Sequence, residues 1–149
     1  MKVVLLSCLM FVCTVTLADG APTETQPSAL QRLATATSAI QGKNWPAAIT
    51  ELNGVVKEEP RNADAHNLLA YSYRKQNRPD LPRAFEHYRT ALKLNPNHKG
   101  AHEYIGEAYL MDKKPAEAEK HLVELQRICG NKTCEEYRDL ANALAKYKP

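Results

Sequence analysis

The sequence lacks the motifs that mark the commonest enzyme classes. It has no glycine-rich phosphate loop, no nucleophile elbow and no helical metal-binding motif. Basic residues never occur five in a row, and no aromatic-basic module for nucleic acid is present. The net charge of +3 is spread along the chain, as on an ordinary solvated helical surface. We therefore expect no enzyme activity, no catalytic residue, no cofactor, no metal site and no nucleic-acid partner.

The chain also lacks an apolar run long enough to span a bilayer. After Lys2, the stretch from Val3 to Ala18 is uncharged but about 16 residues long, whereas a membrane helix needs about 20. A positive start, a short apolar stretch and a polar sequence after it are typical of a secretory signal peptide. We expect residues 1–20 to be that signal and residues 21–28 to be a flexible leader.

The predicted signal peptide implies that the mature chain lies outside the cytoplasm. The short signal and the compact single-domain plan favour a bacterial periplasm, with no stable membrane insertion after cleavage. A secreted form, a retained membrane anchor and a lipid-anchored form are the alternatives. In the membrane-anchored form the apolar stretch would stay in the mature protein, and in the lipid-anchored form Cys8 would stay.

Cysteine is scarce in the mature chain, where only Cys129 and Cys134 remain. An even pair in an oxidising compartment predicts a structural disulfide. The alternative is a redox-active or metal-binding dithiol. The four residues between the cysteines differ from the two-residue spacing of thioredoxin-like motifs, and no strand-helix context surrounds them.

What the chain does have is a pattern that recurs every 34 to 36 residues. Each copy has a small residue, a large residue four positions later, an apolar residue three beyond that, and a helix-ending residue. The four sets are Ala48, Ala84 and Ala118; Leu52, Tyr88 and Leu122; Val55, Ala91 and Leu125; and Pro60, Pro96 and Gly130. A repeat of this length predicts helix pairs that bury their faces against their neighbours.

The apolar spacing places these pairs along a single domain over residues 29–149. We expect repeats at about 29–62, 63–98 and 99–132, followed by a capping helix at 133–147. The turn in the second copy, Asn77–Pro82, is two residues longer than its counterparts. This insertion should shift one turn without breaking the stack.

The second and third copies resemble the tetratricopeptide repeat. That family alternates small and large side chains across two helices, and the third copy matches it in six places. The matching residues of the second copy are His66, Leu69, Ala70, Tyr73, Ala84, Tyr88, Ala91 and Pro96. Those of the third copy are His102, Ile105, Gly106, Tyr109, Ala118 and Leu122. The resemblance implies an all-α, right-handed α-solenoid of three helix pairs plus a C-terminal capping helix.

The resemblance also implies a function, because such arrays bind protein segments in the concave groove lined by their first helices. We expect a non-enzymatic interaction scaffold or assembly factor with a peptide or protein partner. The expected groove residues are Asn67, Tyr71, Arg74, Lys75, Glu103, Glu107, Leu110 and Arg138. The residues that hold a C-terminal carboxylate in some family members are not reproduced here.

Three other interpretations stay open from the sequence. Arg74 and Arg138 could neutralise Glu103 and Glu107 within the protein. The chain could act through its thiol pair, or it could stack on further copies of itself. His66 and His102 occupy equivalent repeat positions, as do His87 and His121, so packing is the favoured role for these histidines.

Overall fold

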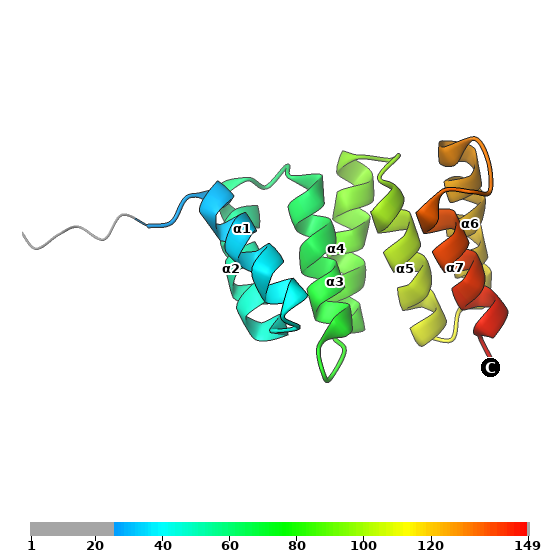
Figure 1. Ribbon diagram of the computed structural model, residues 1–149, viewed down its shortest axis with the longest axis horizontal. Coiled ribbons are helices and arrows are strands. Elements are labelled where there is room, and N and C mark those ends of the chain that lie inside the picture. The colour runs from blue at the N-terminus through cyan, green and yellow to red at the C-terminus, as the bar shows by residue number, and fades with distance from the viewer. Residues whose placement is uncertain (1–25, 149) are drawn as a thin grey trace, which may run out of the picture.

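The computed structural model describes residues 26–148, which hold seven α-helices and no strand. The predicted signal peptide, residues 1–20, and most of the predicted leader lie outside this range. The helices are α1 (Ala29–Gln41), α2 (Trp45–Glu58), α3 (Ala63–Lys75), α4 (Leu81–Leu94), α5 (Lys99–Met111), α6 (Pro115–Cys129) and α7 (Glu135–Lys146). They stand side by side in chain order from α1 and α2 at one end to α6 and α7 at the other (Figure 1). The predicted all-α solenoid is confirmed.

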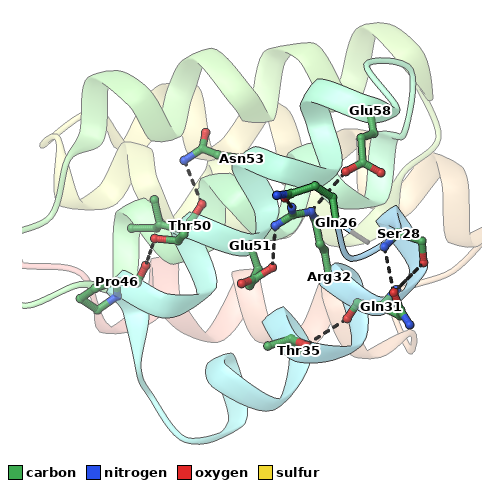
Figure 2. Close-up of polar contacts among 11 residues, drawn as sticks. Gln26, Ser28, Gln31, Arg32, Thr35, Pro46, Thr50, Glu51, Asn53 and Glu58 are labelled. Atoms are coloured by element: carbon green, nitrogen blue, oxygen red, sulfur yellow. Dashed lines mark hydrogen bonds and ion pairs between the residues drawn. The ribbon is translucent and has the colours of Figure 1, made fainter. Parts of the chain in front are cut away.

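Short polar residues and prolines define where these helices begin. The hydroxyl of Ser28 and the side chain of Gln31 form a capping box at α1 (Figure 2). The side chains of Asn44, Asn62 and Asp80 accept backbone N–H groups at the starts of α2, α3 and α4. A proline lies in the first turn of α2, α4 and α6, where its missing N–H has no cost.

The first helix pair is joined by an arginine that crosses from α1 to α2. Arg32 donates to Glu51 and to Glu58, both at 3.2 Å (Figure 2). Gly54 in α2 makes room for it, because a Cβ there would lie 2.7 Å from Cδ of Arg32. These contacts fix the two helices beside each other at the N-terminal end of the stack.

The core follows the alternation of small and large residues that the repeat predicts. Ala36, Ala48, Ala70 and Ala84 are fully buried, and Tyr88, which is also fully buried, belongs to the same core cluster. The large apolar side chains packed with them include Leu52, Leu69, Tyr73, Phe85 and Ile105. Small residues let neighbouring helices approach closely, so bulky rings from the next helix can fill the remaining gaps.

The capping helix α7 also packs through a large residue placed opposite a small one. Gly106 of α5 faces Leu140 of α7, and a Cβ on Gly106 would lie 2.6 Å from a methyl carbon of Leu140. Leu140 is fully buried, whereas Arg138 and Asp139 beside it are exposed. The last helix therefore covers the apolar face of the third pair and turns a polar face outward.

Candidate interaction face on α3, α5 and α7

The residues expected to line a groove lie on three helices that follow one another in the stack. Asn67, Tyr71 and Arg74 lie on α3, and Glu103 and Glu107 lie on α5. Helix α5 packs against both α3 and α7. We call the surface formed by these residues, together with Lys75, Tyr104, Leu110, Glu136, Arg138 and Asp139, the first-helix face.

Arg74 is held within this face by the protein itself. Its Nη1 lies 2.7 Å from Oε2 of Glu107, and its Nε donates to the hydroxyl of Tyr88 at 3.3 Å. The guanidinium also lies 5.4 Å from the ring centroid of Tyr71 and 5.5 Å from that of Tyr104. Only 5% of Arg74 is exposed. The internal ion pair left open by the sequence is therefore present for Arg74 and Glu107.

These contacts perturb the ionisation of Arg74 and of its partner Tyr88. Burial alone would lower the pKa of Arg74, but the interactions with Tyr88 and Glu107 outweigh it and raise that pKa. Burial raises the pKa of Tyr88 well above its usual value, although Arg74 opposes the shift. Arg74 is therefore a permanent cation that positions Glu107 and the two tyrosine rings.

Aromatic rings form a continuous row across three helix pairs. The ring of Trp45 meets Tyr71 edge-on with centroids 6.0 Å apart, and Tyr71 lies 4.9 Å from Tyr104. The ammonium group of Lys75 lies 5.9 Å from the Tyr71 centroid. Tyr71 and Tyr104 are partly exposed, so this row offers apolar ring surface beside a cation.

Glu103 is the most unusual residue of the face. It is 8% exposed, and no hydrogen bond or ion pair to it is present within residues 26–148. Burial is the main reason that its pKa rises to about 8, and the carboxylates of Glu107, Asp139 and Glu136 raise it further. Asn67 on α3 is 6% exposed, and its Oδ1 likewise has no donor in that range.

The remaining predicted groove residues are more accessible. Lys75 and Arg138 are exposed, and Leu110 is half-buried. Neither Lys75 nor Arg138 forms an ion pair with any residue that the structure describes. Whether any of these residues contacts a partner stays a prediction.

A small cavity of about 360 Å³ opens next to the aromatic row. It lies where the α1–α2 turn meets the longer α3–α4 turn, so the inserted residues of the second copy contribute to its wall. Its lining residues are Lys43, Asn44, Trp45, Pro46, Gln76, Asn77 and Arg78. Trp45 belongs to both this cavity and the aromatic row.

Two histidine pairs connect the helices of the second and third repeats, in agreement with the packing role expected for these residues, although their mutual contact was not predicted. Nδ1 of His66 lies 3.0 Å from Nδ1 of His87, and the corresponding atoms of His102 and His121 are 2.9 Å apart. Nε2 of His66 faces the carbonyl of Pro60 at 3.1 Å. A carbonyl only accepts, so Nε2 carries a proton; in the neutral ring of His66, Nδ1 then accepts and His87 donates.

The second pair repeats this arrangement, because Nε2 of His102 lies 3.0 Å from the carbonyl oxygen of Pro96. Burial lowers the pKa of His87, of His102 and of His121, the last to about 4, and in His87 and His121 the histidine partner adds to the effect. The signal in the sequence was the equal placement of both pairs in successive repeats. Their contact could not be read from spacings of 21 and 19 residues.

The cysteine pair lies between α6 and α7. The two Sγ atoms of Cys129 and Cys134 are 2.04 Å apart, which is the separation of a disulfide bond. Glu136 is close enough to form a three-residue group with them. Two thiolates bound to one metal ion would lie farther apart than this, so the geometry does not favour a metal site.

Comparison with known proteins agrees with the fold. The family model described as tetratricopeptide repeat matches residues 33–81 and 80–131. These two spans cover more than half of the chain, which therefore belongs to the tetratricopeptide repeat family.

Three solved structures of low sequence identity share the architecture. The TPR2B domain of yeast Sti1, solved as a complex with pHsp70, is 18% identical with a TM-score of 0.71, over 80% of this chain and 98% of that one. The first TPR of Spaghetti (RPAP3), bound to the HSP90 peptide SRMEEVD, is 20% identical with a TM-score of 0.67, over 79% and 94%. MamA from Desulfovibrio magneticus RS-1 is 19% identical with a TM-score of 0.64, over 70% and 58%.

One curated protein matches part of the sequence. The E3 SUMO-protein ligase RanBP2 of Drosophila melanogaster is 31% identical over 67 residues, or 45% of this chain. The match spans about 2% of the length of that relative. Within residues 26–148, none of the helices is both long and apolar enough to cross a membrane.

Proposed function

We propose that this protein is a non-enzymatic interaction scaffold that binds an extended segment of a partner protein on its first-helix face. The observation that carries the proposal is the row of partly exposed rings, Tyr71 and Tyr104, held in place by Arg74. Aromatic side chains contribute much of the binding energy at protein interfaces. Two structural neighbours, of Sti1 and RPAP3, were solved with Hsp70 or HSP90 partners, which supports a similar use of this fold here.

The buried contacts separate the residues that hold the first-helix face in place from those that can contact a partner. Arg74 is already bound by Glu107, Tyr88 and two rings, so it positions the surface and does not itself contact the partner. Tyr71 and Lys75 are the accessible groups beside it. We therefore propose that the residues in direct contact with the partner are Tyr71, Lys75, Tyr104, Leu110 and Arg138. Glu107, which is paired with Arg74, lies at the edge of this contact surface.

The test begins with affinity capture from the native envelope fraction, followed by overlapping peptides of each captured protein and measurement of their affinities. We expect the Tyr71→Ala variant to lose about tenfold or more in affinity for the binding peptide, because truncation of a central aromatic residue removes a large part of the contact. Val123→Ala is the matched control, since Val123 lies on α6 and is 65% exposed. Equal affinities of the Tyr71→Ala variant and the wild type, with both folded, would refute this assignment.

We also propose that the protein is exported, into a bacterial periplasm, and that Cys129 and Cys134 are bonded there. The apolar N-terminal stretch and the sulfur separation support this proposal. N-terminal sequencing of protein from the envelope should begin after Ala18 or Gly20. Thiol titration under denaturing conditions should find no free thiol before reduction, whereas a readily reducible pair with a potential near those of known oxidoreductases would favour the thiol-dependent alternative.

A further inference from the structure

Glu103 is an almost fully buried residue whose carboxyl group has no partner within residues 26–148. Carboxylates are rarely this buried unless a donor or a cation accompanies them. Glu103 has 8% of its surface exposed, and no donor from residues 26–148 reaches its carboxyl group. A positively charged donor from outside the described residues would provide that partner.

Among the described residues, none of the cations on this face forms an ion pair with Glu103, and Arg138 of α7 is exposed and also forms none. The helix that carries Glu103 contributes Glu107, and α7 contributes Glu136 and Asp139, all carboxylates. From α3 the nearby charge is Arg74, which donates to Glu107 and Tyr88 and lies beside two rings. Nζ of Lys99 lies 3.7 Å from Oε1 of Glu136, so Lys99 pairs with that carboxylate and not with Glu103.

A second acceptor from another helix lies near the same site. Asn67 on α3 is 6% exposed, and its Oδ1 is buried with no donor among the described residues. The Asn67 side chain packs on Gly100, since its Nδ2 lies 3.5 Å from the position of a Cβ on that residue. Gly100 and Glu103 are one turn apart and so share a face of α5. The Asn67 side chain of α3 therefore lies opposite the turn of α5 that carries Glu103.

The aromatic row supplies the wall of this patch. Tyr104 follows Glu103 directly in α5, and its ring lies 4.9 Å from that of Tyr71. The negative faces of such rings attract cations, as they already do for Arg74. Carboxylate, amide oxygen and ring face together match a group that carries positive charge and several N–H donors.

We propose that Glu103, with Asn67 and Tyr104, forms a subsite that binds the side-chain cation of a lysine or arginine in the partner segment. The proposal rests on the proposed function, because it names the chemistry of one residue of the segment that the first-helix face holds. The partner segment is therefore basic at this position, and the chain differs from family members that hold a carboxylate.

Cation binding at this subsite has a measurable consequence. With a pKa of about 8, about nine-tenths of the Glu103 carboxyl groups are protonated at pH 7 in the free protein. A bound ammonium group favours the ionised form, so binding lowers that pKa and releases close to one proton per site. A carboxyl group that is only a neutral structural element releases none.

The experiment uses the mature protein and two probes, N-acetyl-lysine methylamide and N-acetyl-norleucine methylamide, of which only the first carries a side-chain ammonium group. The carboxyl carbon of Glu103 is followed by NMR during a pH titration with each probe. We expect the lysine probe to lower the pKa of Glu103 and to saturate, and the norleucine probe to leave it unchanged. Equal effects of the two probes, or no saturable effect of the lysine probe, would overturn the proposal.

Two variants separate the subsite from its surroundings. Glu103→Gln keeps the size of the side chain and removes its charge, and we expect at least a fivefold loss of affinity for the lysine probe. Glu119→Gln removes an exposed carboxylate from α6 and should bind it as the wild type does. Unchanged affinity of folded Glu103→Gln would reject the assignment of this residue.

The failure of the subsite can be distinguished from the failure of the proposed function. A partner peptide whose affinity falls in the Tyr71→Ala variant, but not when its lysines and arginines are replaced by norleucine, would sustain the interaction face and reject the subsite. A norleucine peptide with a free N-terminus that titrates Glu103 would instead assign the site to a chain terminus, and would also reject the side-chain proposal.

Discussion

The burial of Glu103 predicts how the stability of the protein depends on pH. We consider the substitution Glu103→Gln, which replaces the carboxyl group with a neutral amide of similar size. In the folded protein the pKa of Glu103 is about 8, compared with an ordinary value of 4.5. A raised pKa means that the folded state favours the protonated form, so its stabilising contribution is complete below about pH 4.5 and is lost as the pH rises to about 8.

The magnitude follows from this difference in pKa. The shift from 4.5 to about 8, at about 1.4 kcal/mol per pH unit, gives an upper bound of about 5 kcal/mol. Relaxation of the site and the small remaining contact with water reduce this value. We expect the free energy of unfolding of Glu103→Gln, relative to the wild type, to rise by about 2–4 kcal/mol between pH 4.5 and pH 8.

The assay is urea denaturation followed by circular dichroism at pH values from 4.5 to 8.5. The difference in unfolding free energy between Glu103→Gln and wild type is plotted against pH, so that contributions from the histidines cancel. Glu119→Gln is the control and should give a flat difference, because its carboxylate is exposed. A flat difference for Glu103→Gln as well would refute the reasoning, since it would mean that the carboxyl group is effectively solvated.

Three further predictions concern the scaffold. The unfolding free energy of His121→Gln relative to the wild type should rise as the pH falls from about 6.5 to about 4, because His121 takes up its proton in the unfolded chain before it does so in the folded protein; urea titrations give this difference, in which the opposite contribution of Glu103 cancels. Gly106→Ala should lower the unfolding free energy by about 1–3 kcal/mol, because the new methyl group clashes with Leu140. In a chain that already carries Leu140→Ala, Gly106→Ala should leave the unfolding free energy unchanged in the same assay. Reduction of the cysteine pair should cost about 2 kcal/mol, measured as the shift in urea midpoint; no shift would contradict a cross-link.

The sequence could predict the fold because its repeat is specified by local rules. Small residues such as Ala84 and Ala118 recur at intervals close to those of the family, and they are fully buried in the structure. Gly106 occupies a small-residue position for the same reason and accommodates Leu140. Each of these choices depends on a neighbouring helix whose position the repeat itself fixes.

The environment of the face could be predicted only in part. Repeat position indicates which side of α3 and α5 a residue lies on, but not how far its neighbours cover it. The rings of Tyr71 and Tyr104 lie beside Arg74, which leaves only 5% of it exposed. The burial of Glu103 likewise depends on how closely α7 approaches α5, a distance that no spacing in the sequence encodes.

The histidine pairs show a second reason for this limit. His66 and His87 meet where the two helices of one repeat pack together, and His102 and His121 repeat the contact. Equivalent positions in two copies indicated packing but not a shared hydrogen bond. The carbonyls of Pro60 and Pro96, which fix the protonation of each pair, come from the turns before the helices.

The most direct test of the account is to map where a partner peptide touches the protein. Backbone amide chemical shifts of the mature chain would be recorded by NMR with and without the tightest-binding peptide from the captured partner. We expect the largest changes to cluster on the first-helix face, around Tyr71, Lys75 and Glu103. Changes centred on α2, α4 and α6, with this face unaffected, would contradict it.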